Sequence, residues 1–238
     1  MYNLLDVYAH RGASSTATEN TMAAFEEARL LGATGVELDV HFSSDGVAVV
    51  FHDESLQRMT GVKKLITEVT IKEIMKLKQG GRFTRRILGN RITLFKEVEQ
   101  WAEQYAIPLN VELKATMADN AEAVHAFLHA LHLPKGSHIS SFDETLLATV
   151  RKQRPDIDVA LIATKKTDWL ALHEQDITFV HAHKRHYTPE KVQSVEKAGY
   201  KMRLYGIDGT EPFLAKPHEA IIGYITDYPE QVVKQVRG

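Results

Sequence analysis

Apolar, strand-like runs alternate with helix-like segments along almost all of this 238-residue chain. Alternation at this spacing indicates parallel strands joined by crossover helices. Eight strand and helix pairs predict an α/β fold, a closed (β/α)8 TIM barrel, with residues 1–238 as one domain. The strands are predicted at 5–10, 36–42, 108–113, 137–141, 158–162, 177–182, 201–205 and 221–226, and the helices at 20–31, 94–105, 119–131, 143–153, 167–174, 189–198, 211–216 and 229–236.

Residues 53–92 interrupt this alternation because they are too long for a simple connection and contain several glycines. They predict a small insertion after the second strand, lying over the barrel mouth. Its basic side chains could attract an anionic substrate, but we favour the interpretation that they keep a surface loop solvated. The basic residues are Arg82, Arg85, Arg86 and Arg91.

Composition excludes several classes of function. The net charge is −2 and basic residues are scattered, so no nucleic-acid partner is expected. Cysteine is absent, which excludes disulfides, thiolate catalysis and cysteine-ligated metals. No apolar run is long enough to predict a membrane span, and the first residues lack a secretion signal, so a cytoplasmic location is expected. The sequence does not predict an oligomeric state.

Charged residues and histidines gather at the ends of the early strands. His10-Arg11 ends the first strand, Glu37 and Asp39 lie on the second, and Glu112 and Lys114 end the third. Because side chains alternate along a strand, Glu37 and Asp39 share one face, and so do Glu112 and Lys114. The active sites of (β/α)8 barrels lie at the C-terminal ends of the strands, so these groups are expected to meet there.

A hairpin is predicted to bring His52 to the same place. Asp45-Gly46 between apolar runs indicates a two-residue turn, which would put Asp39 opposite His52. A surface charge pair is the alternative, but it would not explain Glu37 within an apolar strand. His41 has the same parity and is interpreted as lying behind the site or at its rim. The remaining histidines of note, His181, His183 and His186, are interpreted as surface or strand-end residues rather than a zinc site.

The donor set indicates the chemistry. Glu37, Asp39 and Glu112 offer hard oxygen ligands, which suit Ca²⁺ or Mg²⁺. A divalent cation and nearby Arg11 and Lys114 are suited to an anionic phosphate ester. His10 and His52, with ordinary pKa values near 6.5, can divide the roles of general acid and general base.

In their order, these residues resemble the glycerophosphodiester phosphodiesterase family. The matching motifs are His10-Arg11-Gly12, Glu19-Asn20-Thr21, Glu37-Leu38-Asp39, His52-Asp53, Glu112-Leu113-Lys114, Ser140-Ser141-Phe142 and Ile225-Thr226-Asp227-Tyr228-Pro229. The resemblance therefore covers nearly the whole chain.

The resemblance implies a metal-dependent enzyme that hydrolyses glycerophosphodiesters to an alcohol and sn-glycerol 3-phosphate, in glycerol and lipid metabolism. It implies His10 and His52 as the acid and base pair, with Arg11 and Lys114 as phosphate contacts. One divalent cation, Ca²⁺ or Mg²⁺, would be held by Glu37, Asp39 and Glu112. Which histidine is the acid, and whether a cyclic phosphate forms, stay open.

One departure concerns the pocket. Tyr205-Gly206-Ile207-Asp208 stands where the family commonly has tryptophan, threonine, valine and asparagine. Tyr205 can still stack on a small polyol, so it is a candidate substrate contact, and the preferred alcohol stays open. The alternatives are a related barrel phosphodiesterase acting on lysophospholipids or phosphoinositides, as a lysophospholipase D or a cyclising lyase, and a non-catalytic protein that binds phosphate esters.

Overall fold

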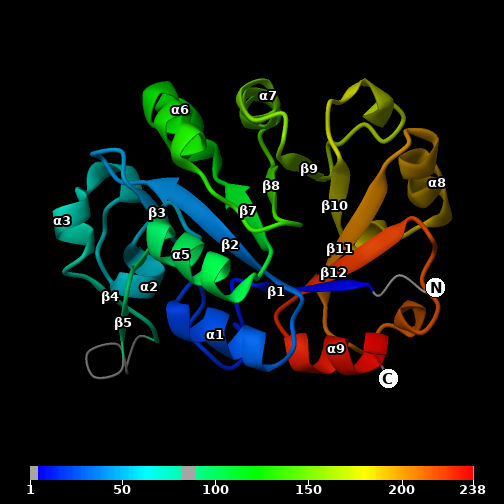
Figure 1. The fold of residues 1–238 in the computed structure, drawn as a ribbon, viewed down its shortest axis with the longest axis horizontal. Helices are drawn as coiled ribbons and strands as arrows, with labels where there is room; N and C mark the ends of the chain where they lie inside the picture. Colours follow the sequence, from blue (N-terminus) through cyan, green and yellow to red (C-terminus); the bar gives the residue numbers. More distant parts are fainter. Residues whose placement is uncertain (1–4, 82–88, 238) are drawn as a thin grey trace.

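The computed structural model describes residues 5–81 and 89–237. Eight parallel strands form a closed barrel, because β1 pairs with β12 on one side and with β2 on the other. The predicted (β/α)8 barrel is therefore confirmed (Figure 1). Its strands are β1 (Asp6–His10), β2 (Gly35–Phe42), β7 (Leu109–Leu113), β8 (His138–Ser141), β9 (Asp158–Ile162), β10 (Phe179–His183), β11 (Lys201–Ile207) and β12 (Ile221–Thr226).

Helices between the strands surround the barrel (Figure 1). Their apolar faces pack on the strands, as Phe25 of α1 and Val98 of α5 do within one large hydrophobic core. No helix in the described part of the chain is both long and apolar enough to cross a membrane. The helices are α1 (Met22–Leu30), α5 (Phe95–Tyr105), α6 (Ala121–Ala130), α7 (Glu144–Gln153), α8 (Pro189–Lys197) and α9 (Pro229–Arg237).

Two predicted helices are wrong. Residues 167–174 form only the short 3-10 helix η3 (Leu172–Glu174), and 211–216 form only η5 (Pro212–Leu214). In the first segment the Asp168 side chain accepts hydrogen bonds from the backbone N–H groups of Leu170 and Ala171 in the manner of a helix N-cap, but only one 3-10 turn follows. In the second, the proline after Lys216 disfavours helical backbone at that residue.

The hairpin after β2 has a different register from the one predicted. β3 (Ala48–Val50) pairs with β2 so that Val40 faces Val50 and His41 faces Val49. Ser43 N–H donates to the Val47 carbonyl, and Gly46 has a φ of +77°, so three residues form the loop rather than two. The prediction that Asp39 faces His52 is therefore wrong by one residue, because Phe51 N–H donates to the Asp39 carbonyl.

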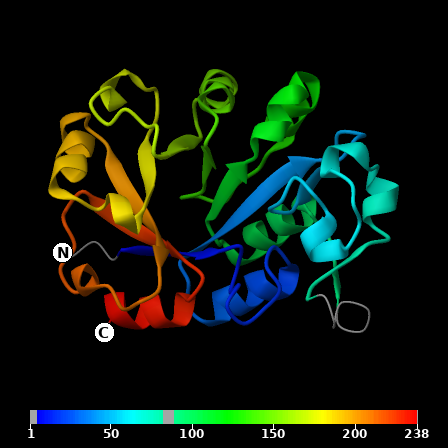
Figure 2. The ribbon, with the colours of Figure 1, turned by 180° about the vertical axis from the view of Figure 1, so that it is seen from behind.

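The described residues of the 53–92 segment, 53–81 and 89–92, lie together at one end of the molecule, beside β3 (Figures 1 and 2). A second hydrophobic cluster, which includes Phe51, Leu56, Ile66 and Ile92, stabilises this segment. Arg82, Arg85 and Arg86 fall outside the described residues. The segment contains α2 (Gln57–Thr60), η1 (Ile66–Glu68), α3 (Ile71–Ile74), β4 (Lys78–Gln79) and β5 (Asn90–Arg91), followed by β6 (Thr93–Leu94), which pairs with β3.

Candidate active site

Three carboxylates meet at the C-terminal end of adjacent barrel strands. Asp39 of β2 pairs in register with Glu112 of β7, and Glu37 lies two residues before Asp39 on the same face. One oxygen from each of the three side chains lies within 4.8 Å of the others, and all three residues are buried. The convergence expected from the sequence is present in the fold.

Two cations partly neutralise this group. Lys114 Nζ lies 2.7 Å from Asp39 Oδ1 and also contacts Glu112, and Arg11 Nε lies 3.3 Å from Asp39 Oδ2. Burial would raise the pKa of Asp39, but Lys114 and Arg11 outweigh it and hold that pKa well below the ordinary value. Burial, together with the negative charge of Asp39, raises the pKa of Glu37 and of Glu112.

The three carboxylates fit a divalent cation. Glu37 Oε1 is buried and has no hydrogen-bond partner among the residues that the structure describes, although a buried carboxylate oxygen normally has one. Three carboxylates carry more negative charge than Lys114 and Arg11 supply, and the raised pKa of Glu37 and Glu112 reflects that excess. A hard divalent ion such as Ca²⁺ or Mg²⁺ would satisfy both the free oxygen and the charge.

A tight turn after β1 aims Arg11 at the carboxylates. Arg11 has a φ of +58°, which is rare for a residue other than glycine, and its backbone N–H donates to Glu37 Oε2 at 2.9 Å. Gly12 follows with a φ of +81°, and a Cβ there would lie 2.6 Å from the backbone carbon of Ala24. The close approach of α1 therefore requires the glycine, and the turn directs both backbone and side chain of Arg11 into the site.

Asn20 is a site residue that the sequence analysis missed. It is buried, has a φ of +56°, and donates from its side-chain amide to Asp39 Oδ2 at 2.7 Å. The sequence analysis placed Asn20 at the start of the predicted helix 20–31, but Thr21 caps α1 by accepting the Ala24 N–H. Its place in the Glu-Asn-Thr motif was the available signal.

His10, the last residue of β1, is held by a residue from the opposite end of the chain. Its Nδ1 lies 2.7 Å from Asp227 Oδ1, and its Nε2 lies 3.9 Å from Glu37 Oε2. Burial would lower the pKa of His10, but the charge of Glu37 and the hydrogen bond to Asp227 outweigh it and raise that pKa. Asp227 follows β12 directly, and the sequence analysis gave it no role.

His52 is held by its neighbour in sequence. Its Nδ1 lies 2.7 Å from Asp53 Oδ1, and the Arg58 guanidinium binds both oxygens of Asp53, at 2.6 and 2.9 Å. Burial lowers the pKa of His52, and the charge of Lys114 acts in the same direction. Buried His41 supports the backbone here by donating from Nε2 to the His52 carbonyl at 3.2 Å. Of the two positions expected for His41, behind the site or at its rim, the structure shows the first.

A cavity of about 180 Å³ opens between these groups. Half-buried Tyr205 and exposed Phe142 line it together with the ionisable residues. His181 also lines the cavity and is 1% exposed, so its interpretation as a surface or strand-end residue is wrong. Every second side chain of a barrel strand points into the barrel, and β10 directs His181 there. The predicted residues that line the cavity are His10, Arg11, Glu37, His52, Glu112, Lys114 and Tyr205.

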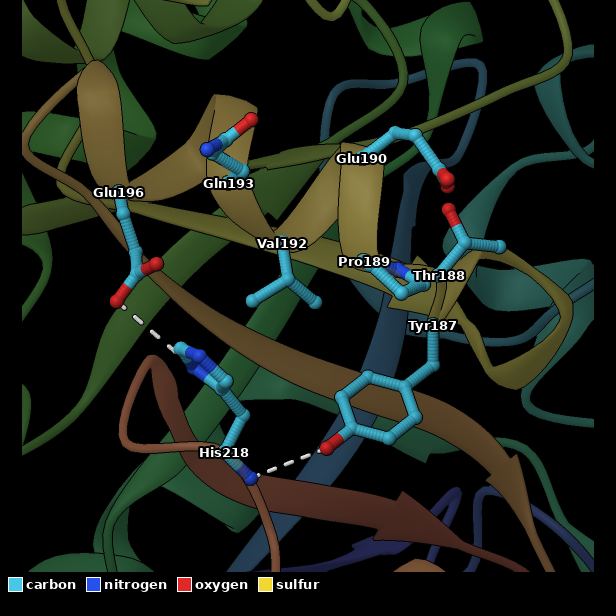
Figure 3. Close-up of a pocket in the computed structure, with 8 residues that line it drawn as sticks. All are labelled: Tyr187, Thr188, Pro189, Glu190, Val192, Gln193, Glu196 and His218. Atoms are coloured by element: carbon cyan, nitrogen blue, oxygen red, sulfur yellow. Dashed lines mark hydrogen bonds and ion pairs between the residues drawn. The ribbon is translucent and has the colours of Figure 1, made fainter.

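A larger cavity, about 540 Å³, lies elsewhere, along α8 (Figure 3). Two polar contacts cross it: the backbone N–H of His218 donates to the Tyr187 hydroxyl at 3.0 Å, and the His218 ring lies 3.8 Å from Glu196. None of the predicted site residues lines this cavity. The smaller cavity at the barrel mouth is therefore the candidate active site.

Comparisons with known proteins agree with the motifs. Residues 10–231 match the model of the glycerophosphoryl diester phosphodiesterase family. The chain is 31% identical over 236 residues to a glycerophosphodiester phosphodiesterase of Caldanaerobacter subterraneus subsp. tengcongensis, with 97% of each protein covered.

Solved structures agree as well. An Oleispira antarctica phosphodiesterase, solved with the product sn-glycerol-3-phosphate, is 28% identical with a TM-score of 0.85, covering 99% of this chain and 98% of that one. A glycerophosphodiester phosphodiesterase from Thermotoga maritima is 26% identical with a TM-score of 0.77, covering 98% and 99%. The resemblance predicted from the motifs is confirmed: the chain belongs to the glycerophosphodiester phosphodiesterase family of enzymes.

Proposed function

We propose that this enzyme hydrolyses glycerophosphodiesters to an alcohol and sn-glycerol 3-phosphate, with one divalent cation, Ca²⁺ or Mg²⁺, held by Glu37, Asp39 and Glu112. The observation that carries the proposal is the convergence of these three buried carboxylates, two of which, Glu37 and Glu112, line the same cavity as His10 and His52. Family membership and the product bound by the Oleispira relative support the same reaction.

When bound, the cation would polarise the phosphate oxygens of the substrate. Arg11 and Lys114 lie beside the carboxylates and would contact the phosphate, adding positive charge where negative charge develops during the reaction. Asn20 holds Asp39 in place through its amide. Tyr205, at the cavity wall, would contact the alcohol or glycerol part of the substrate.

His10 and His52 would move the protons. Both line the cavity, and each ring is fixed through Nδ1, which leaves Nε2 of each available to the substrate. One histidine removes the proton from the attacking water, and the other protonates the oxygen of the leaving alcohol. If the glycerol hydroxyl attacks instead, the product is a cyclic phosphate, which a water molecule must then open to give sn-glycerol 3-phosphate. We also propose that residues 53–92 are an insertion within the single domain, because Arg58 from this segment reaches the site through Asp53 and Glu19.

The test is the release of sn-glycerol 3-phosphate from glycerophosphocholine and glycerophosphoethanolamine, after treatment with EDTA and after restoring Ca²⁺ or Mg²⁺. We expect release only with metal. Release without metal from fully stripped protein would overturn the metal-dependent reaction.

A second set of substrates distinguishes the related activities. Lysophosphatidylcholine and glycerophosphoinositol are offered under the same conditions, and ³¹P NMR identifies open-chain and cyclic phosphate products. Exposed Phe142 at the cavity lining would suit a lipid chain. Turnover of lysolipid alone would favour a lysophospholipase D, and accumulation of a cyclic phosphate would favour a lyase.

A further inference from the structure

Asp227 lies next to the reaction centre, although it is 217 residues away from His10 in the chain. Its Oδ1 lies 2.7 Å from His10 Nδ1 and accepts a second hydrogen bond, also 2.7 Å, from the hydroxyl of Ser14. Both donors come from the segment at the end of β1. This one carboxylate oxygen thus links the residue after β12 to two residues at the end of β1.

The turn that carries Asp227 is fixed by its own hydrogen bonds. The Thr226 hydroxyl donates to the Ile207 carbonyl at 2.6 Å and accepts the Tyr228 N–H at 2.9 Å. The backbone carbonyl of Asp227 accepts the Ser15 N–H at 3.3 Å, and Pro229 begins α9 directly afterwards. Asp227 is therefore placed by two strands and a helix rather than by a free loop, as a positioning group requires.

The hydrogen bond determines the tautomer of His10. An ionised carboxylate can only accept hydrogen bonds, so the proton between the two groups belongs to Nδ1. When the ring is neutral, Nε2 then carries the lone pair, and this is the nitrogen that lies 3.9 Å from Glu37 Oε2. Without Asp227 the ring would be free to adopt the other tautomer or to rotate, and Nε2 would no longer be aimed at the cavity.

The carboxylate that holds His52, Asp53, has its negative charge balanced by a cation. Asp53 accepts two hydrogen bonds from the Arg58 guanidinium, whereas Asp227 accepts from a neutral hydroxyl. The negative charge of Asp227 is thus less balanced by neighbouring cations than that of Asp53. Asp53 offers the same 2.7 Å contact with its charge largely balanced, which makes it a matched control.

We propose that Asp227 is a positioning residue, which fixes the tautomer and orientation of His10 so that Nε2 takes part in proton transfer. The proposal rests on the proposed function in assigning that transfer to phosphodiester hydrolysis. Asp227 is not one of the three clustered carboxylates, and in this proposal it does not contact the substrate.

The kinetic test is a double-mutant cycle on the metal-loaded enzyme, with release of sn-glycerol 3-phosphate from glycerophosphocholine as the readout. We expect Asp227→Asn to lower kcat by on the order of 10- to 100-fold with little change in KM, and Asp227→Glu to recover part of the loss. In a His10→Ala background the same change should cost nothing further, because Asp227 acts through His10. An equal loss in both backgrounds, or a loss below about 2-fold in the wild-type background, would overturn the proposal.

A second readout needs no activity. ¹⁵N NMR of the histidine rings, at a pH where they are neutral, should show His10 protonated at Nδ1 in the parent protein and redistributed toward Nε2 in Asp227→Asn. Asp53→Asn should leave the His10 signals unchanged, and His10→Ala assigns them. An Nδ1-protonated His10 that persists in Asp227→Asn would contradict the proposal. Failure of glycerol 3-phosphate release in the parent protein would instead contradict the proposed function.

Discussion

His10 and His52 both bind an aspartate through Nδ1 at 2.7 Å, yet the two pairs are built differently. The His52 pair is made by consecutive residues, and Arg58 links its aspartate, Asp53, to Glu19. The His10 pair joins the two ends of the chain and exists only when the barrel closes. The first can form locally, whereas the second depends on the complete fold. We therefore expect the two histidines to have different roles and to depend to different degrees on the complete barrel.

Removing each imidazole ring is expected to have the largest effect on activity. We expect His10→Ala and His52→Ala each to lower kcat for glycerophosphocholine by about 10²- to 10⁴-fold, since each loses a proposed proton-transfer group. Metal affinity, measured by calorimetry, should be nearly unchanged. Loss of metal binding in His52→Ala would mean that His52 is a ligand.

The same two variants also assign the roles. A p-nitrophenyl phosphodiester has a leaving group that needs no protonation, so the variant lacking the acid should recover most of its rate on that substrate. The variant lacking the base should stay slow. Equal recovery of both variants would show that the two histidines do not divide the work.

The carboxylates separate metal binding from proton transfer. Glu112→Gln removes a charged group, the proposed third metal ligand, which is within reach of Glu37 and Asp39, and we expect metal affinity to fall at least 10-fold, with activity partly rescued at high metal concentration. The measurement is the rate as a function of free Mg²⁺ or Ca²⁺. Full activity of this variant without added metal would exclude Glu112 from the site.

A smaller effect is expected from Arg58→Ala. The guanidinium orients Asp53 and balances its charge, but it touches no group that lines the cavity. We expect kcat to fall only about 2- to 5-fold, less than for Asp227→Asn, because exposed ion pairs contribute little. A loss as large as that of His52→Ala would mean that the Asp53 and Arg58 pair is as important as the ring it holds.

The last prediction concerns stability rather than activity, and two histidines other than His10 and His52. His138 and His181 are buried inside the barrel, with ring centres 5.1 Å apart and, in the described part of the chain, no hydrogen-bond partner on any ring nitrogen. Burial, with the charge of Arg203 acting in the same direction, lowers the pKa of both rings well below 6.5. The folded state therefore binds fewer protons than the unfolded state below that pH, and the free energy of unfolding should decrease as pH falls below about 6.5.

Urea unfolding at pH 7.5 and 5.5 checks this expectation. His138→Phe keeps the ring packing against Tyr8 and Phe179 and removes the titrating group, so its loss of stability on acidification should be smaller by about 1 kcal/mol. The exposed His129→Gln serves as control. An identical loss in His138→Phe and the parent protein would refute the expectation.

The sequence predicted the parts that depend on local pattern. Strand alternation predicted the barrel, and strand-end parity predicted the meeting of Glu37, Asp39 and Glu112. The hairpin register was wrong because Asp45-Gly46 is compatible with both a two-residue turn and a three-residue loop, and a shift of one residue changes every opposed pair.

What the sequence did not predict depends on closure of the barrel. Asp227 and His10 are brought together only when β12 pairs with β1, and spacing along the chain gives no sign of it. Asn20 was missed because a backbone φ of +56° turns it away from the helix it precedes and toward Asp39. His181 was misplaced because a polar side chain inside a barrel has the sequence pattern of an exposed one.

The most direct test of the account is a metal titration of stripped protein, following bound ion and sn-glycerol 3-phosphate release in the same samples. We expect one divalent ion per chain and a rate that rises in proportion to occupancy, with both lost together in Asp39→Asn. A rate independent of bound ion, or an ion that binds equally well to Asp39→Asn, would contradict the carboxylate site at the centre of the account.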